Sequence, residues 1–557
     1  FRVRRSTLQN LRSAHVTSDG RRREMLLPLL LPLLFLSSSA RSLDVLVYLN
    51  SLGKSHVAFA DGLIEALVRR GHQVDLILTR MNSLVRSNGS AAVRRLVTVD
   101  FPDGSPWDTS AAHLQDPFTF TPSWTPFLTN HRRTFADLSN KMCAYTLDSV
   151  DVQNLLSSIV YDVALVSAYD FCAFGLLAAA GVRPVTSFVA TPPLQITAKA
   201  SGVPELPAYE NWILDARVSP NRLHFIDRLL DSYRTWHASQ GYWYMAEQYT
   251  ALFRSRYGDK FPDAVALTRN VTFDFANTNT LLAETRPLPP RAKLIGGIGM
   301  QKPKPLSRHF DELLNSAASH GTVIISFGTQ VPANIIPKHV LDSFYAAAQA
   351  FPDFNFVFKY DGPVTFNSSN LIAVDWLPQT DLLYDSRVVG FVSHVGLNSL
   401  TESAFAGVPL VAIPLFADQM HNAWRAAQLG IGRTLSKYEI SPSTMIEALH
   451  FILREPSTRA RSKELAEQLL TFPEQPERIF VESIEYAAKF KNLHEHLQVT
   501  GALLADFAHY GHDILLTAAS IALFFLLLSG MLLWRCVKLG AGVLHPVITR
   551  RAKAKDE

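Results

Sequence analysis

Blocks of apolar residues along the chain are separated by helical patterns and turn residues, which predicts repeated strand–helix–strand units. The run LDVLVYL (43–49) is typical of a buried strand. A helical pattern follows from His56 to Arg70 and ends at Gly71, and HQVDLIL (72–78) predicts the next strand. Strand, helix and strand in this order make a βαβ unit, so we expect a parallel sheet in this part of the chain.

A second series of the same kind follows the proline-rich stretch RPLPPRAK (286–293), which is typical of an inter-domain linker. Its predicted strands are GTVIISFGT, FNFVFKY, VVGFVSH and LVAIPLF, and IPKHVLDSFYAAAQAF predicts a helix. Residues 205–260, rich in Trp, Tyr, Leu and Arg, also indicate helix. Because 557 residues exceed one ordinary core, we expect two α/β domains in tandem.

Two uninterrupted apolar segments indicate targeting rather than core. From Met25 the chain reads MLLPLLLPLLFLSSSA, in which eleven apolar residues (26–36) precede Ser38 and Ala40, the pattern of a cleaved signal peptide. The chain opens with Phe1, so residues 1–24 are expected to be upstream translation if Met25 is the start; an upstream start remains open.

The second apolar segment, Ile514 to Trp534, has 21 residues without a formal charge. As a helix it would span about 31 Å, the thickness of a hydrocarbon core. Arginines and lysines follow it, so the positive-inside bias predicts a cytosolic tail (535–557) and a luminal body. Lys553 and Lys555 have the spacing of a dilysine endoplasmic-reticulum retrieval signal. The triplets at Asn88, Asn270 and Asn367 are compatible with N-glycosylation of a luminal body.

Charge and cysteine count exclude some classes of protein. The net charge is +4, but residues 1–24 contribute +5 and residues 535–557 contribute +4, so the rest carries about −5. A nucleic-acid-binding body is therefore not expected. Three cysteines cannot form a disulfide framework or a four-thiolate zinc site, and they do not define the redox compartment.

The stretch FVSHVGLNSLTES (391–403) leads from a predicted strand into a predicted helix. Ser399 and Glu402 fit the S-x-x-E pattern of a capping box, so these residues could serve only to cap a helix. The amino end of a helix at the carboxyl edge of a parallel sheet is also where α/β proteins bind phosphates. Free N–H groups near Gly396 and Ser399, with His394 beside them, would suit a diphosphate.

The wider window WLPQTDLLYDSRVVGFVSHVGLNSLTESAFAGVPLVAIPLFADQMHN resembles the signature of the UDP-dependent glycosyltransferases, which have the two-domain GT-B fold. Trp376 to Gln419 spans 44 residues, the length of that family's nucleotide-sugar signature. SFGT (326–329), LIGGIG (294–299) and SHVAFADGLIEALVRRGHQVDLI (55–77) also resemble the family, so the resemblance runs from about residue 43 to 557. It implies two Rossmann-like domains facing a cleft, followed by one transmembrane helix.

The resemblance implies a role for each donor-site residue. Trp376 would stack on uracil with Gln379 beside the base or ribose, and Glu402 would accept the ribose hydroxyls. The expected diphosphate ligands are His394, Gly396, Asn398 and Ser399, assisted by Ser326 and Thr329. Asp418 and Gln419 would bind the sugar. The sequence departs from the family at Val395, where glycine is usual, and at Asp385 and Ser386, where His-Pro is common.

On the amino side, the resemblance assigns the general base to His56, which is largely neutral near pH 7 at an ordinary pKa. Relatives pair this histidine with an aspartate, but the matching position in YDVALVSAYDFCAFG is Ser167. Asp170, three residues on, could reach the same ring if the segment is helical. The partner is therefore open between Asp170, Ser167 and another group.

These observations predict a membrane-anchored endoplasmic-reticulum glycosyltransferase of type I topology. Its expected segments are the upstream segment and signal (1–40), the acceptor-binding domain (41–285), the UDP-sugar-binding domain (286–470), a helical return (471–513), the membrane helix (514–534) and the tail (535–557). It would transfer a hexosyl group, with inversion, from UDP-glucose or UDP-glucuronate to small lipophilic hydroxyl or carboxyl acceptors. No metal or cofactor is expected, UDP-sugar being a co-substrate.

Several alternatives remain open. The family contains users of both UDP-glucuronate and UDP-glucose, and the sequence does not choose between them. Oligomeric state, including a homo-oligomer, is equally open. Val395 and Ser167 favour a rival hypothesis, a catalytically weak member that binds UDP-sugar or lipophilic ligands without turnover. A P-loop hydrolase is excluded, because NSLGKS has Tyr48 where the motif requires its first glycine.

Overall fold

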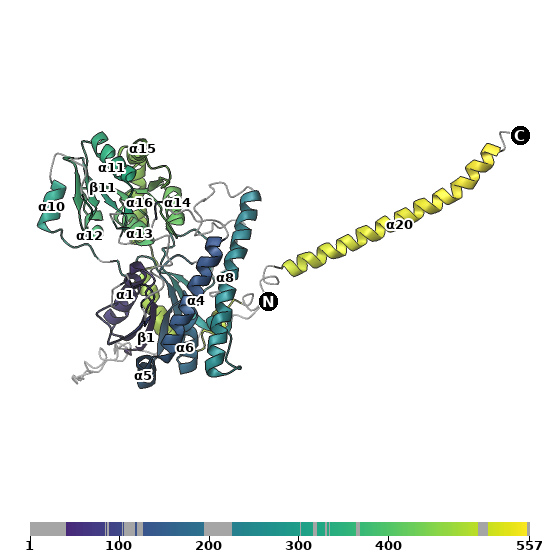
Figure 1. The fold of residues 1–557 in the computed structure, drawn as a ribbon, viewed down its shortest axis with the longest axis horizontal. Helices are drawn as coiled ribbons and strands as arrows, with labels where there is room; N and C mark the ends of the chain where they lie inside the picture. Colours follow the sequence, from purple (N-terminus) through teal and green to yellow (C-terminus); the bar gives the residue numbers. More distant parts are fainter. Residues whose placement is uncertain are drawn as a thin grey trace, which may run out of the picture. The chain divides into compact units, whose positions relative to one another are not determined.

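The computed structural model describes residues 41–83, 85, 89–102, 104, 117–119, 126–193, 225–300, 302–315, 320–328, 331, 332, 335–363, 368–499 and 511–553. All contacts below lie within the unit Leu43–Glu557. Figure 1 shows its strands in two groups, each covered by helices of its own.

The first sheet is parallel throughout, and its described strands run in the order β3-β2-β1-β4-β5-β6-β7. The strands are β1 (Asp44–Asn50), β2 (Gln73–Arg80), β3 (Arg95–Asp100), β4 (Val163–Ser167), β5 (Val185–Val189), β6 (Val271–Ala276) and β7 (Ala292–Leu294). The order reverses direction between β1 and β4, and such a switch point opens a crevice at the carboxyl ends of the strands.

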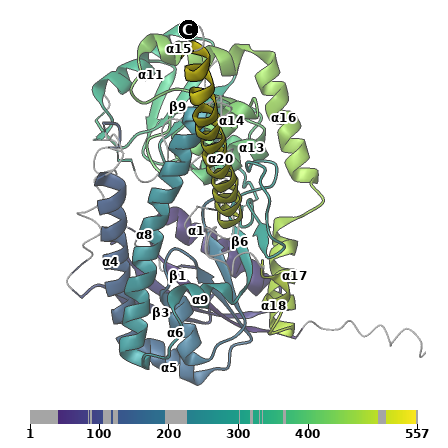
Figure 2. The ribbon, with the colours of Figure 1, turned by 90° about the vertical axis from the view of Figure 1, so that its right-hand side faces the viewer.

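Helices cover both faces of this sheet, because its strands are apolar on both sides. Along β1, Val45 and Val47 pack in a core cluster with helix α1 (Lys54–Arg69), whereas Leu46 and Tyr48 pack in the cluster on the opposite face. That opposite face is covered by α4 (Pro126–Asp148), α5 (Val150–Ser158), α6 (Cys172–Ala180), α8 (Phe225–Tyr257) and α9 (Ala264–Arg269). Helices α4 and α8 run side by side (Figure 2).

The second sheet is also parallel, with its described strands in the order β10-β9-β8-β11-β12-β13. The strands are β8 (Thr322–Ser326), β9 (Asn355–Lys359), β10 (Leu371–Val374), β11 (Val388–Ser393), β12 (Leu410–Ala412) and β13 (Gly432–Thr434). Its helices are α10 (Arg308–Asn315), α11 (Lys338–Ala350), α12 (Gln379–Leu383), α13 (Leu397–Ala406), α14 (Gln419–Gln428), α15 (Pro442–Arg454) and α16 (Pro456–Thr471). The predicted pair of parallel α/β sheets is confirmed.

The segments after and between the sheets add detail to the predicted boundaries. The first sheet continues past residue 286, because β7 pairs with β6. Helix α17 (Pro476–Lys489) returns to the first sheet, where Phe480 and Ile484 are fully buried in the cluster that contains α1; the short α18 (His494–Leu497) follows. The predicted helical region 205–260 contains α8, and its residues 205–224 lie outside the described ones.

Helix α20 (His512–Lys553) is drawn in Figure 1 as one unbroken helix. Within it, His512–Leu539 is long and apolar enough to cross a membrane, and no other helix of the described ranges meets this test. The predicted membrane segment Ile514–Trp534 lies inside that span.

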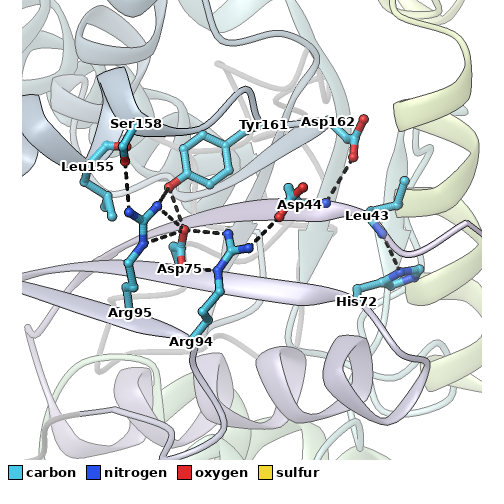
Figure 3. A network of polar contacts seen from close by, with 10 residues as sticks. All are labelled: Leu43, Asp44, His72, Asp75, Arg94, Arg95, Leu155, Ser158, Tyr161 and Asp162. Atoms are coloured by element: carbon cyan, nitrogen blue, oxygen red, sulfur yellow. Dashed lines mark hydrogen bonds and ion pairs between the residues drawn. The ribbon is translucent and has the colours of Figure 1, made fainter.

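An ion-pair network around one buried carboxylate ties the amino ends of three strands of the first sheet together (Figure 3). Asp75 of β2 is fully buried, and its carboxylate accepts hydrogen bonds from Arg94 (2.8 and 2.9 Å), Arg95 (2.7 and 3.2 Å) and the hydroxyl of Tyr161 (2.8 Å). Burial alone would raise the pKa of Asp75, but these hydrogen bonds outweigh it and lower the pKa to about 2. The carboxylate therefore stays charged although it is fully buried.

Two of the three cysteines form a disulfide that joins α4 to α6, between Cys143 and Cys172, with a Cα–Cα distance of 5.4 Å. Their separation of 29 residues carries no signal that pairs them, so the sequence did not predict this bond. Cys536, in α20, is free and exposed.

Candidate active site

The turn between β11 and α13 gives the second sheet a set of backbone donors that no side chain caps. His394 follows β11 directly, and Gly396 is the N-cap of α13, so no side chain caps the first turn of this helix. The first N–H groups of a helix have no intrahelical partner. They are therefore available to an anion at the carboxyl edge of the sheet.

The capping-box interpretation of Ser399 and Glu402 is wrong, because α13 begins at Leu397, before both residues. Ser399 Oγ instead accepts from Gln379 Nε2 at 3.3 Å. Glu402 accepts from Gln379 and, at 3.0 Å, from the hydroxyl of Thr380. Each oxygen keeps a further lone pair, so both can still accept from a ligand diol.

Val395 shows how the turn tolerates a branched residue where glycine is usual. Its φ is +54°, in the left-handed region, which costs a non-glycine residue about 1–2 kcal/mol. Its side chain is fully buried in the core cluster with Phe391 and Leu400. Burial of a valine is worth about 1.5–3 kcal/mol, which offsets the strain. Its N–H donates to Ser393 Oγ (3.0 Å) and its carbonyl accepts from Asn422 (3.1 Å), so Val395 itself offers no free amide.

The imidazole of His394 is held between two glycines. A Cβ atom on Gly328 would lie 2.7 Å from Cε1 of His394, and one on Gly396 would lie 2.9 Å from Nε2, so both positions require glycine. Ser326, at the end of β8, pairs with Ser393 in the sheet and accepts from the Gly328 N–H at 3.3 Å. The predicted Thr329 lies outside the described residues.

Trp376 exposes 64% of its surface at the same edge, as a stacking platform requires. Nζ of Lys359 lies 5.0 Å from the centre of its ring and donates to the carbonyl of Gly328 at 2.6 Å. The sequence interpretation missed Lys359; the signal was a cation at the end of a buried strand, in FNFVFKY.

Asp418 and Gln419 mark the start of α14. Asp418 Oδ2 accepts from Asn422 at 2.8 Å, and burial raises the pKa of its carboxyl. Gln419 Oε1 accepts from the backbone N–H groups of Leu415 (2.8 Å) and Phe416 (3.2 Å). The carboxamide is thereby fixed, with its NH₂ group left to donate.

His56 lies in the first turn of α1, directly after the carboxyl end of β1. Its Nδ1 is buried and has no hydrogen-bond partner among the described residues. Its ring packs on that of Tyr169, with 4.7 Å between the ring centres. Burial lowers the pKa of His56 to about 4, so the ring is neutral near pH 7.

The two candidate partners of His56 lie on opposite faces of the first sheet. Ser167 lies on the α1 face of β4, in line with Val163 and Leu165, and its buried Oγ has no partner in the described part of the chain. Asp170 accepts from Asn50 and from the N–H of Cys172 (2.8 Å), on the other face, and burial raises its pKa to about 6. No hydrogen bond joins Asp170 to His56, and the choice of a partner for His56 stays a prediction.

Contacts join the two sets of residues. The amide of Asn277, after β6, donates to Asn398 Oδ1 at 3.3 Å. Arg425 of α14 donates to the carbonyls of Leu281 (3.3 Å) and Leu282 (3.0 Å). The segment that follows β6 is therefore hydrogen-bonded to the predicted diphosphate ligand Asn398 and to helix α14.

Comparison with known proteins gives this arrangement a family. Residues 44–539 match the family described as "UDP-glucoronosyl and UDP-glucosyl transferase". The chain belongs to this family. A Caenorhabditis elegans protein named as UDP-glucuronosyltransferase ugt-47 is 25% identical, covering 90% of this chain and 94% of its own. The human 2-hydroxyacylsphingosine 1-beta-galactosyltransferase is also 25% identical, covering 90% of each chain.

Solved structures agree on the fold. A UDP-glucosyltransferase from Polygonum tinctorium that glucosylates indoxyl has a TM-score of 0.55 at 15% identity, covering 81% of this chain and all of its own. The calicheamicin glycosyltransferase CalG4 has a TM-score of 0.53 at 17% identity, covering 81% and 99%. This UDP-glycosyltransferase thus has the predicted GT-B fold, with one candidate membrane helix after it.

Acid should destabilise this UDP-glycosyltransferase through two histidines. Burial lowers the pKa of both His56 and His394 to about 4, and nearby Lys359 adds to the effect on His394. Between pH 6.5 and 4 the unfolded chain binds protons that the folded rings do not. The stability that the two neutral rings contribute is complete above pH 6.5 and falls by up to about 3 kcal/mol each as the pH approaches 4.

Thermal unfolding of the detergent-solubilised protein between about pH 7.5 and about pH 4.5 checks this prediction. Burial raises the pKa of Asp61 and Asp170 to about 6, so these two carboxyls stabilise the folded protein as the pH falls. The effect of the histidines is therefore measured by comparing the change in Tm of the wild type with that of a His56→Gln/His394→Gln variant. The variant should lose less Tm than the wild type on acidification. Parallel Tm curves would contradict the pKa values of both rings.

Proposed function

We propose that this UDP-glycosyltransferase transfers a glucosyl or glucuronosyl group, with inversion, from UDP-sugar to a hydroxyl or carboxyl group of a small lipophilic acceptor. His56 takes the acceptor proton, the acceptor oxygen bonds to the anomeric carbon, and the bond from that carbon to the diphosphate breaks, so UDP leaves. The carrying observation is the neutral imidazole of His56, whose Nδ1 has no partner among the described residues, in a domain whose Asn277 is hydrogen-bonded to Asn398 in the uncapped first turn of α13.

The donor site follows from the chemistry of its residues. Trp376 offers an exposed indole for uracil, and Gln379 with Glu402 offers an amide and carboxylate for ribose. The first N–H groups of α13, with His394, Asn398 and Ser399, meet the diphosphate, assisted by Ser326. Asp418 and Gln419 hold the sugar. This assignment needs no metal or cofactor to meet the diphosphate charge.

UDP release tests the proposal. Full-length protein in detergent is offered UDP-glucose, UDP-glucuronate and UDP-galactose separately, each with a panel of phenols, alcohols and carboxylic acids. We expect acceptor-dependent UDP release with one donor well above the others. Equal release with and without acceptor would indicate hydrolysis and contradict the transferase proposal.

A second candidate function is binding without turnover. It is favoured by Ser167 on the α1 face, because a serine supplies no negative charge to stabilise a protonated His56. In that case UDP-sugar would raise the Tm of the protein, yet no donor would release UDP with any acceptor.

We also infer that the protein is a single-pass membrane protein of the endoplasmic reticulum with its body in the lumen. The candidate span His512–Leu539 precedes the cationic tail, and the Cys143–Cys172 disulfide is typical of an oxidising compartment. Asn270, in the triplet Asn-Val-Thr, is exposed at the end of α9. The triplets at Asn88 and Asn367 lie outside the described residues.

Glycan analysis checks this localisation. Asn270→Gln should remove one increment of endoglycosidase-H-sensitive mobility, whereas Asn315→Gln, which is exposed but in no such triplet, should remove none. Replacing Lys553 and Lys555 with alanine should release the protein to later compartments and make its glycans resistant. Wild-type glycans that are already resistant would contradict residence in the endoplasmic reticulum.

A further inference from the structure

The imidazole of His56 is placed by packing rather than by a charged partner. Its described neighbour is the ring of Tyr169, 4.7 Å away between centres and tilted by 35°. Tyr169 follows β4 and is buried, in a cluster with Val189 and Ala276. Burial lowers the pKa of His56. The ring of Tyr169 therefore limits where the imidazole can lie.

Tyr169 is itself fixed by a chain of hydrogen bonds that ends at the donor side. Its hydroxyl accepts from the Ala190 N–H at 2.9 Å and meets the Thr191 hydroxyl at 3.3 Å. The carbonyl of Ala190 accepts from Asn277 Nδ2 at 3.3 Å. The other hydrogen of the same amide group points to Asn398 Oδ1, also at 3.3 Å.

Tyr169 and Asn277 are both buried, so their side chains have few other arrangements. Tyr169 is 8% exposed and Asn277 is 5% exposed. Burial raises the pKa of Tyr169, to which the nearby carboxylate of Asp418 adds, so the hydroxyl keeps its proton. A neutral phenol and a carboxamide have no charge state to change near pH 7.

We propose that Tyr169 and Asn277 are positioning residues that set the distance between His56 and the first turn of α13. They do by packing and neutral hydrogen bonds what a carboxylate beside the histidine would do by charge. The inference rests on the proposed function, because it gives the base and the donor helix their mutual placement. A misplacement of about 1 Å between reacting groups can cost about 100-fold in rate.

Kinetics of two single variants test the proposal. Tyr169→Leu removes the aromatic face and keeps apolar volume; Asn277→Ala breaks the link to Asn398. Each should lower kcat by about 10–100-fold while the KM for UDP-sugar changes less than about threefold. The control is Asn279→Ala, since Asn279 is equally buried and its side-chain oxygen accepts from the Leu281 N–H, within its own turn, at 2.9 Å. Its kcat should stay near the wild-type value.

The double variant separates a chain from two independent contacts. If Tyr169 and Asn277 act in series, breaking either link already frees the imidazole, so Tyr169→Leu/Asn277→Ala should lose little more than the worse single variant. Tyr169→Leu/Asn279→Ala should show additive effects. Losses that multiply in the first pair, or a KM for UDP-sugar that rises as far as kcat falls, would overturn the proposal.

A spectroscopic measurement keeps the inference separate from the proposed function. In ¹³C-histidine-labelled protein, assigned with a His56→Gln variant, the ring current of Tyr169 shifts the His56 signal. That shift should disappear in Tyr169→Leu, move in Asn277→Ala and stay in Asn279→Ala. If the wild type shows no turnover, the proposed function fails while these shifts still decide the placement of the ring. An unchanged His56 signal in Tyr169→Leu would overturn the inference even in an active enzyme.

Tyr169→Phe covers the case in which the leucine variant does not fold. It keeps the ring against His56 and removes the hydroxyl, and with it the acceptor for the Ala190 N–H and the hydrogen bond with Thr191. We expect a smaller loss of kcat, about 3–10-fold, that does not multiply with Asn277→Ala. If Tyr169→Phe and Asn277→Ala, each measured as a single variant, both kept the wild-type kcat, the hydrogen bonds between Tyr169 and Asn398 would have no role in placing His56.

Discussion

His56→Ala is expected to lower kcat by about 10²–10⁴-fold, because the acceptor hydroxyl then has no general base. The KM for UDP-sugar should change little, since the residues assigned to the donor belong to the second sheet and its loops. Turnover of a saturating donor with a fixed phenol, followed by UDP release, measures the effect. Thermal stabilisation by UDP should be as large in the variant as in the wild type.

The control for this experiment is His320→Ala. His320 is exposed at the start of the second sheet, where it pairs with Asp353 at 2.7 Å, outside the candidate site. Its loss should leave kcat unchanged. If His56→Ala retained kcat within about twofold, a different group would have to take the proton and the assignment of the base would be wrong.

The sequence was sufficient for the fold because the strands of both sheets carry strong local signals. LDVLVYL, predicted as a strand, became β1, and the helical pattern from His56 became α1. Strands covered on both faces read as continuous apolar runs, which are hard to mistake at this length. The signature window, Trp376 to Gln419, also predicted that its residues lie in one region, because their order along the chain determines which strand each turn follows.

What the sequence did not predict depends on contacts between distant segments. Tyr169, Asn277 and Lys359 gain their roles from neighbours that lie far from them in the chain. The Cys143–Cys172 disulfide is of the same kind. A local pattern carries no information about which residue faces which across a sheet, and here that information decides the placement of the base.

The turn at Val395 illustrates a second limit. Compared with the family's glycine, a valine predicts hindrance at the phosphates, because a branched side chain restricts the backbone. The side chain is directed into the core and its N–H is satisfied by Ser393, and the effect of Val395 on phosphate binding stays a prediction. The sequence does not show whether the Val395 side chain points toward the phosphates or into the core, because that direction depends on the packing of the whole second sheet.

Asp75→Asn is expected to destabilise the protein by about 2–3 kcal/mol, because the pKa of Asp75 is lowered to about 2 and each unit of pKa corresponds to about 1.4 kcal/mol of preference for the charged form. Arg94 and Arg95 both bind Asp75, whose side chain is fully buried, at the amino ends of β2 and β3 (Figure 3). His56 follows the carboxyl end of β1, at the opposite edge of the same sheet. Stability should therefore fall while kcat, measured well below the unfolding temperature, remains near that of the wild type.

Asp44→Asn is the matched control, since Asp44 pairs with the same Arg94 at 2.7 Å but is 37% exposed. A solvent-exposed pair of this kind contributes at most about 1 kcal/mol. Thermal unfolding should consequently give a Tm loss several times larger for Asp75→Asn than for Asp44→Asn. The pKa of Asp75, about 2, adds a pH test: its share of stability is complete above pH 3.8 and is lost as the pH falls through 2. Equal Tm losses for the two variants would mean that burial does not set the strength of this network.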